Sequence, residues 1–315
     1  DGNVILTMRM IAFMNTKAAR SLIDLDHHIL KVNNPSAARK AYQRLGFTVS
    51  PFRSNDPMGG GSTGGAGGNH LVMLTPQSPQ TTNMIELAYC DRDHAWPALK
   101  TLLGGSQGLA LLVHSPSDVD KIQQEWVDAG IPCDPVFEVK TRFDDPETDR
   151  VDTIHFRVAQ PSQHDWRYSF GAAQIYDFSH YLRDDWCTHE NTALFWSDIS
   201  LFVPDDEIEF GRNYLEKVYG QRPEPDADGR LIYKVNRLSL SVLPNSLVAQ
   251  TYSGIPLETS DAEQCHTALS VVVQDMTRLR EVLARRQVKT YEKDAGVFVA
   301  PSDACGVLLR FIEAA

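Results

Sequence analysis

Four times along the chain, a short run of apolar residues leads into a segment with the spacing of an amphipathic helix. The runs have alternating or continuous apolar positions, as β-strands do, and the following segments have apolar residues every three or four positions, as α-helices do. The four runs end at Val32, Val113, Val203 and Val273. The helical segments extend to Gly46, Gly130, Gly220 and Gln287. The glycines suit the left-handed position that ends many helices, and Ser36 or Ser117 can cap the start of its helix.

Each predicted helix is followed by two or three further strands, such as residues 70–74 and 83–89 after the first helix. The repeated unit is about 70–90 residues long, which is too short to enclose a core of its own. We therefore expect the units to pair, giving an α+β protein with two domains near residues 21–190 and 191–315. Residues 1–20 are expected to form an N-terminal extension outside the fold.

The composition narrows the choice of partners. With 30 Lys and Arg against 41 Asp and Glu, the chain has a net charge of −11 and would repel nucleic acids and anionic membranes. The five cysteines form no CxxC pair, which favours reduced thiols in a cytoplasmic protein. No apolar run is long enough to span a bilayer. We expect a small-molecule substrate, no nucleic-acid or membrane partner, and a homo-oligomer.

Two kinds of titratable residue lie within predicted strands of the first unit. His27 and His28 begin the first strand, and because side chains alternate along a strand, one of them must face each side of the sheet. Glu86 interrupts the apolar strand at residues 84–89, so its carboxylate must face solvent, be paired or bind a metal. A histidine and a glutamate on strands of one sheet are predicted to form a joint site.

These residues carry a resemblance to a known family. Residues 27–34 (HHILKVNN), the helix after them and the strand at residues 85–89 (IELAY) resemble one β-α-β-β-β module of the vicinal oxygen chelate superfamily. That superfamily includes glyoxalase I, extradiol dioxygenases and methylmalonyl-CoA epimerase. The resemblance covers about residues 22–315 and implies four modules paired into two domains. It also implies that His27 and Glu86 bind a divalent metal.

Three further segments are similar to glyoxalase-like bacterial proteins of this superfamily. They are a glycine-rich stretch that precedes Asn69 and His70, a strand that ends in His180, and the segment from His189 to Ala193. A catalytic metal usually has three protein ligands, so one more is needed besides the two above. We predict His180 as the third ligand, with His189 and His155 as alternatives. Such a set suits Fe(II), Mn(II), Ni(II) or Zn(II).

The other modules depart from the family pattern. The positions equivalent to the metal-binding histidine hold Gly108, Asp198 and Ala268, and the last module has Arg310 at the position of the glutamate. One half-site therefore remains, in the first domain. The second domain is expected to have a degenerate site and to act as a scaffold or as a cover for the substrate.

The resemblance implies a glyoxalase-like lyase or isomerase that acts on a small oxygen-rich substrate through a metal-stabilised enediolate. Such a reaction needs a base, and Glu86 or His189 is predicted to serve. Two alternatives stay open. One is an Fe(II) ring-cleaving dioxygenase of the extradiol type with a rearranged ligand set. The other is a metal-free protein that binds or sequesters a small molecule, which the incomplete ligand set favours.

Overall fold

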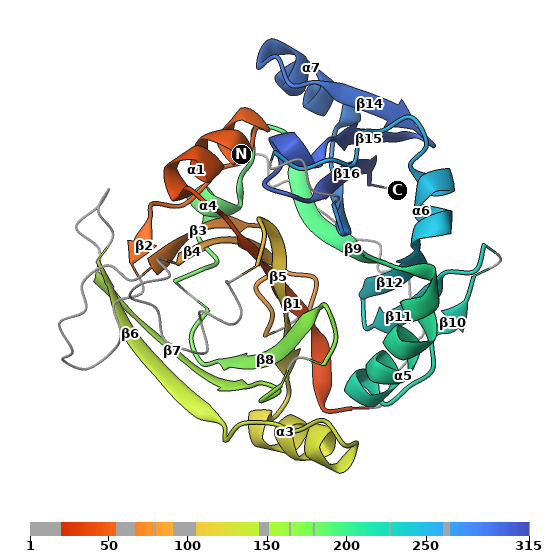
Figure 1. Ribbon diagram of the computed structural model, residues 1–315. Coiled ribbons are helices and arrows are strands. Elements are labelled where there is room, and N and C mark those ends of the chain that lie inside the picture. Colours follow the sequence, from red (N-terminus) through yellow and green to blue (C-terminus); the bar gives the residue numbers. More distant parts are fainter. Residues whose placement is uncertain are drawn as a thin grey trace, which may run out of the picture.

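The computed structural model of the chain contains two curled β-sheets with helices packed against them (Figure 1). It describes residues 20–54, 67–78, 80–90, 105–144, 151–163, 165–178, 180–226, 228–260 and 265–314. Except for Arg20, the predicted N-terminal extension lies outside these ranges.

The first sheet has eight strands in the spatial order β2-β3-β4-β1-β5-β8-β7-β6. These strands are β1 (Leu22–Lys31), β2 (Arg53–Ser54), β3 (Gly67–Met73), β4 (Met84–Cys90), β5 (Gly108–Pro116), β6 (Phe137–Asp144), β7 (Val151–Ala159) and β8 (Ser169–Ile175). Strand β1 is parallel to β4, the last strand of its own module, and antiparallel to β5. The central β1–β5 pair therefore joins the first module to the second.

The second sheet repeats this arrangement in the order β10-β11-β12-β9-β13-β16-β15-β14. Its strands are β9 (Ala193–Val203), β10 (Glu224–Pro225), β11 (Leu231–Val235), β12 (Leu238–Pro244), β13 (Thr267–Val273), β14 (Thr290–Lys293), β15 (Gly296–Val299) and β16 (Leu308–Glu313). Strand β9 is again parallel to the last strand of its module, β12, and antiparallel to β13. The predicted α+β fold, with four modules paired two by two, is confirmed.

Helices follow the first strand of each module, as the sequence pattern predicts. The helices are α1 (Pro35–Arg44), α3 (Val119–Asp128), α4 (Asp184–Cys187), α5 (Ile208–Tyr219), α6 (Asn245–Thr251) and α7 (Met276–Arg285), with 3₁₀ turns η1 (Asp205–Glu207) and η2 (Pro301–Asp303). The caps differ from the predicted serines: Asn34 and Asp118 accept the first free backbone N–H groups of α1 and α3. Gly220 ends α5 in the predicted left-handed conformation, with φ of +66°. None of the described helices is long and apolar enough to cross a membrane.

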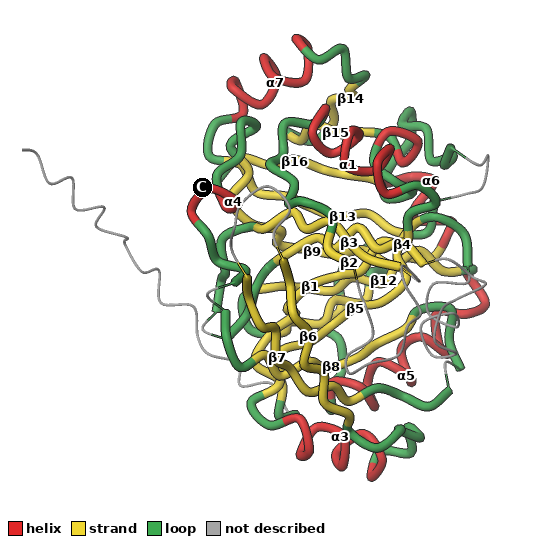
Figure 2. The backbone as a smooth tube through the Cα atoms, turned by 90° about the vertical axis from the view of Figure 1, so that its left-hand side faces the viewer, coloured by secondary structure: helices red, strands yellow, loops and turns green. Residues whose placement is uncertain are grey.

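The two sheets share one hydrophobic core. Leu30 of β1 and Tyr42 of α1 belong to the same buried cluster as Ile199 of β9 and Leu215 of α5. Figure 2 shows the strands of both sheets in the middle of the molecule, with α3 and α5 towards one end and α1 and α7 towards the other. Helices α1, α3, α5 and α7 cover one face of the sheets, and the opposite, concave faces hold polar groups together with smaller apolar clusters, one of which packs against α6.

Candidate functional site

Strand pairing places His27 and Glu86 on the concave face of the first sheet. In the register between β1 and β4, His27 is opposite Met84 and Ile29 is opposite Glu86. Paired residues share a face, as do residues two apart along a strand, so the two side chains are diagonal neighbours. His28 points to the other face, where it packs edge-on against the ring of Trp196. The predicted alternation of the two histidines is confirmed.

The ring of His27 is held by the residue just before it. The Nδ1 atom of His27 is 2.5 Å from Oδ1 of Asp26, a fully buried carboxylate that also accepts hydrogen bonds from the backbone N–H and hydroxyl of Thr82. Consecutive residues of a regular strand point apart, but the β1–β5 register shifts between Leu25 and His27. This bulge brings the Asp26 carboxylate beside the ring. Because a carboxylate only accepts hydrogen bonds, Nδ1 donates in this contact and the ring is oriented with Nε2 on the opposite side.

The free nitrogen of His27 is directed at Glu86. Its Nε2 atom is 3.8 Å from Oε2 of Glu86, and both side chains are largely buried. The other carboxylate oxygen, Oε1, accepts a 2.8 Å hydrogen bond from Nδ2 of Asn69 on β3. Asp26 thus orients His27, and Asn69 orients Glu86. Neither Asp26 nor Asn69 is itself a predicted metal ligand. The Oδ1 atom of Asn69 is buried and has no hydrogen-bond partner among the described residues.

Arg53 and Tyr181 lie beside this pair. Arg53 is opposite Asn69 in the β2–β3 register, and its guanidinium is 5.2 Å from the centre of the Tyr181 ring. Burial raises the pKa of Tyr181, nearby Glu86 raises it further, and Arg53 opposes both by favouring the phenolate. Tyr181 is therefore a neutral hydrogen-bonding group next to the buried carboxylate at neutral pH.

The first sheet supplies few ligands beyond this half-site. Val113 of β5 is opposite His27, and Gly171 of β8 is opposite Val113, so no ligand comes from these positions of the second module. This agrees with the incomplete pattern of that module. Within the described parts of the chain, no three His, Cys, Asp or Glu side chains form a group that could hold a metal ion.

His180 is not gathered with the other two predicted ligands into such a group. It lies after β8 and before α4, with Nε2 3.4 Å from a carboxylate oxygen of Asp177. Its role as third ligand therefore stays a prediction. The alternative, His155 on β7, forms a 2.5 Å contact with Oε1 of Glu138 on β6 and stacks near Tyr176. That contact lies at the edge of the sheet, where the glutamate is half exposed.

His189, the predicted base or alternative ligand, has both ring nitrogens hydrogen-bonded to the backbone. Its Nδ1 atom accepts a 3.0 Å hydrogen bond from the backbone N–H of Thr48, and Nε2 donates a 2.7 Å bond to the backbone oxygen of Met73. Burial lowers the pKa of His189 to about 4, although the bond to Met73 opposes this. Both ring nitrogens are occupied by the backbone, so neither a metal nor a substrate proton has a site on this ring.

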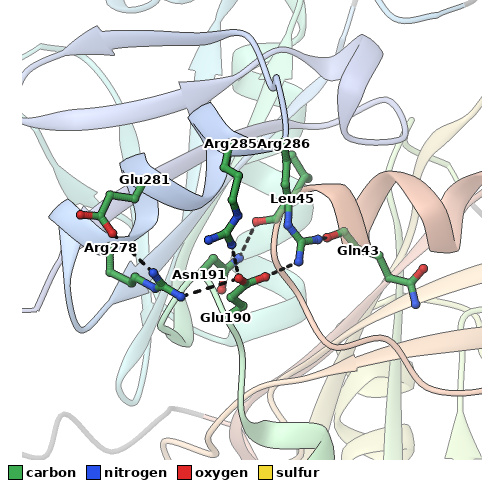
Figure 3. Close-up of polar contacts among 8 residues, drawn as sticks. All are labelled: Gln43, Leu45, Glu190, Asn191, Arg278, Glu281, Arg285 and Arg286. Atoms are coloured by element: carbon green, nitrogen blue, oxygen red, sulfur yellow. Dashed lines mark hydrogen bonds and ion pairs between the residues drawn. The ribbon is translucent and has the colours of Figure 1, made fainter.

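The residues after His189 have a structural role as well. Figure 3 shows Glu190 facing Arg278, Arg285 and Arg286, all from α7 and its end. Asn191, which is fully buried, donates a 2.9 Å hydrogen bond to the backbone oxygen of Leu45 at the end of α1. Glu190 and Asn191 therefore form contacts between the first and the second domain, and they are not part of the candidate site.

Sequence reasoning missed Asp26, Thr82 and Arg53. The aspartate directly precedes the first histidine, which is a visible signal, but in a regular strand the two side chains would diverge. Only the bulge makes them partners. Arg53 lies on a strand of two residues, too short for a periodic signal.

The residues present fit half of a metal site. A histidine nitrogen and a carboxylate oxygen each bind a divalent ion at about 2.1 Å, so two ligands of one ion can be up to about 4.2 Å apart. The observed 3.8 Å separation lies within that limit. Asp26 and Asn69 also provide the hydrogen bonds that orient metal ligands from behind. The donors His27 and Glu86 would hold the ion, and the other coordination positions are not supplied by this pair.

Comparisons with known proteins agree with this architecture. Among solved structures, a hypothetical protein from Staphylococcus aureus is similar over 92% of this chain and 99% of its own, with a TM-score of 0.57 and 9% identity. A triple mutant of 4-hydroxymandelate synthase from Streptomyces coelicolor covers 93% of both chains, with a TM-score of 0.55 and 10% identity. The 2,3-dioxygenase LapB from Pseudomonas sp. KL28 covers 94% of this chain and 93% of its own, with a TM-score of 0.50 and 11% identity.

At such low identities these likenesses establish the fold and not the reaction. No curated protein matches the sequence significantly. The family model described as a glyoxalase-like domain matches residues 25–208, which is more than half of the chain and includes every strand of the first sheet after the start of β1. The chain therefore belongs to the glyoxalase-like domain family, within the vicinal oxygen chelate superfamily.

Proposed function

We propose that this protein is a metal-dependent enzyme that acts on a small oxygen-rich substrate at the concave face of its first sheet. The observation that carries the proposal is the contact between Asp26 and His27, which leaves Nε2 of the histidine 3.8 Å from the carboxylate of Glu86. The buried histidine nitrogen and carboxylate oxygen face each other at a distance too long for a hydrogen bond, and a cation between them would contact both.

Each residue of the candidate site would have a distinct role. His27 and Glu86 would hold the ion, which when bound supplies Lewis-acid activation of a substrate oxygen. Asn69 holds Oε1 of Glu86, so Oε2 would either bind the ion or, when it does not, take a proton from the carbon beside a substrate carbonyl. The buried phenol of Tyr181 next to Arg53 would exclude water from this side of the site. Such proton transfer is the chemistry of a lyase or an isomerase.

Metal content tests the proposal. The full chain would be purified without chelators or a histidine tag, loaded in turn with Fe(II), Mn(II), Ni(II) and Zn(II), and measured by mass spectrometry beside His27→Gln and Glu86→Gln. We expect about one ion per chain in the parent and a loss in both variants. Glu292→Gln is the control, because Glu292 lies on the second sheet and pairs with Arg280 at the surface. Equal metal content in His27→Gln and the parent would refute the assignment.

The metal that the chain retains would also indicate which reaction to assay. Two of the structural neighbours are a dioxygenase and 4-hydroxymandelate synthase, so a parent chain that retains iron should be assayed for oxygen uptake with catechols. Retention of zinc, nickel or manganese would direct the search to α-hydroxy or dicarbonyl compounds, assayed by exchange of the carbon-bound proton.

A second candidate function is a metal-free protein that binds a small molecule at the same face. It is favoured by the finding that the described residues bring only two side chains of ligand type together there. In that case the parent chain would bind none of the four metals, and His27→Gln would bind the small molecule as the parent does. The metal measurement therefore separates the two candidates.

A further inference from the structure

The second sheet has a polar cluster at positions that correspond to the site of the first. Asp198 lies five residues before Val203, as His27 lies five before Val32. Arg310 lies on β16, at the position in the last module that corresponds to Glu86. The chain thus keeps charged residues at these places in the second domain, although their chemistry differs from that of the first.

Strand register places these residues on one face. Asp198 on β9 is opposite Ser239 on β12 and opposite Ser270 on β13, and Ser270 is opposite Arg310 on β16. Paired residues of neighbouring strands share a face, so a row of polar side chains crosses four strands. Ser241, two residues after Ser239, belongs to the same face.

Asp198 is the centre of a serine cluster. Its Oδ1 atom accepts hydrogen bonds of 2.8 Å from the hydroxyl of Ser239 and 2.9 Å from that of Ser241, and Oδ2 accepts one of 3.0 Å from Ser200. Three hydroxyl donors satisfy the carboxylate without a cation. Because each serine gives its proton to Asp198, the serine oxygens keep lone pairs that can accept hydrogen bonds from a ligand.

Arg310 is not satisfied in the same way. It is only partly exposed, its Nε atom is buried without a hydrogen-bond partner, and it forms no ion pair or hydrogen bond with another described residue. Its guanidinium lies 5.7 Å from the centre of the Phe298 ring, which is the residue opposite it on β15. A partly buried guanidinium of this kind is stabilised by an anion that binds two of its N–H groups.

Tyr252, the residue directly after α6, lies close to both parts of this face. Its ring lies 5.4 Å from that of Phe202 and 6.1 Å from that of Phe298. The pKa of Tyr252 is raised to about 12, mainly by burial and in part by the charge of Asp198. A hydrogen bond to Ser200 and the charge of Arg310 act in the opposite direction. The tyrosine is thus close to the serine cluster and the arginine, and its ring is buried in an apolar cluster with Phe202 and Phe298.

We propose that this face binds a small polyhydroxylated anion. The carboxylate or phosphate of the ligand binds the guanidinium of Arg310, and its hydroxyl groups donate hydrogen bonds to the serine oxygens around Asp198. This site is separate from the candidate site of the first sheet and does not depend on the function proposed for it.

Isothermal titration calorimetry of the full chain tests the proposal. The probes are sodium D-gluconate, which carries a carboxylate, and D-glucose 6-phosphate, which carries a phosphate. D-sorbitol and sodium acetate are the controls, since each has only one of the two required features. We expect at least one probe to bind with a dissociation constant of about 1 mM or lower, at least about tenfold more tightly than either control. The probe that binds better identifies the anionic group.

Variants then locate the binding. Arg310→Gln should weaken the preferred probe at least about tenfold, through loss of the charge-assisted pair. Asp198→Asn should weaken it as well, because an amide cannot accept all three serine protons. Arg280→Gln is the matched control, an arginine of the same domain that pairs with Glu292 at the surface. His27→Gln should bind the probe as the parent does.

Two outcomes would overturn the inference. One is that neither probe binds better than sorbitol and acetate. The other is that a probe binds equally to the parent and to Arg310→Gln with the fold intact by circular dichroism. If Arg310→Gln does not fold, Arg310→Lys keeps the charge but loses the planar pair of donors. Binding of the probe to that variant should then be several-fold weaker than to the parent, and unchanged binding would refute the proposal.

Discussion

Replacing His189 by asparagine should make the stability of this protein less sensitive to acid. In the structure His189 is neutral, because Nδ1 accepts a hydrogen bond from Thr48 and Nε2 donates one to Met73. Asparagine places its side-chain oxygen near the position of Nδ1 and can keep the bond from Thr48. It cannot keep the bond to Met73, and it loses the edge-on contact with the ring of Phe47.

The pH dependence follows from the pKa of the buried ring. Burial lowers the pKa of His189 to about 4, whereas an unfolded histidine titrates near 6.5. The unfolded chain therefore binds the proton first, so the contribution of His189 to stability is present above about pH 6.5 and is lost as the pH falls towards 4. At about 1.4 kcal/mol for each pH unit in that window, the parent loses about 2 kcal/mol between pH 7 and pH 5 through this residue.

Urea unfolding at pH 7 and pH 5, followed by tryptophan fluorescence, measures the effect. At pH 7 the variant should be about 2–3 kcal/mol less stable than the parent, from one lost buried hydrogen bond and lost packing. At pH 5 that difference in stability should shrink by about 2 kcal/mol. Only the parent has the buried histidine whose lowered pKa costs stability at acidic pH. Other histidines titrate in both proteins and cancel in the difference. A difference that is the same at both pH values would refute the reasoning.

Three further predictions concern the junction and the candidate site. Gly46→Ala should lower the free energy of unfolding by about 2–3 kcal/mol in urea titrations, because the backbone has φ of +89° and a Cβ atom would lie 2.7 Å from Val282. Asn191→Ala should cost about 1–3 kcal/mol in the same assay, since it leaves buried backbone groups unpaired, whereas Glu190→Gln, at a partly exposed ion pair, should cost less than about 1 kcal/mol. Equal losses in these two would contradict the assignment. Under the proposed function, Asp26→Asn should weaken metal binding about 10–100-fold in competition with a chelating dye, while unchanged affinity would show that the aspartate does not orient the ligand.

The sequence predicted the architecture well because the fold depends on features that a sequence shows directly. Strands β9 and β13 end at the predicted valines, β1 ends one residue before Val32 and β5 runs three residues past Val113, and the internal repeat implied the pairing of modules. The alternation of His27 and His28 between the two faces followed from strand geometry alone. These predictions need only local periodicity and the need to bury apolar surface.

The candidate site was harder to predict because it depends on contacts between distant segments. His189 was a plausible base in the sequence, yet its two partners, Thr48 and Met73, lie more than a hundred residues away. The link between Asp26 and His27 depends on a bulge, which leaves no mark in the apolar pattern. Counting histidines in the sequence therefore overestimates how many can bind a metal, since backbone groups form hydrogen bonds with the ring nitrogens of some of them.

The division of the sheets into an apolar and a polar face explains where chemistry can differ between the two domains. The helix-covered faces build one shared core, so substitutions there would cost packing in both domains. The concave faces have smaller apolar clusters beside their polar groups, and the same strand positions hold His27 in one sheet and Asp198 in the other. His27 is contacted by Asp26 of its own strand, Glu86 by Asn69 of the next strand, and Asp198 by Ser200 of its own strand and by two serines of β12. Because strand pairing brings such neighbours together whatever the residue type, loss of the metal-ligand pattern from the second domain does not imply loss of binding there.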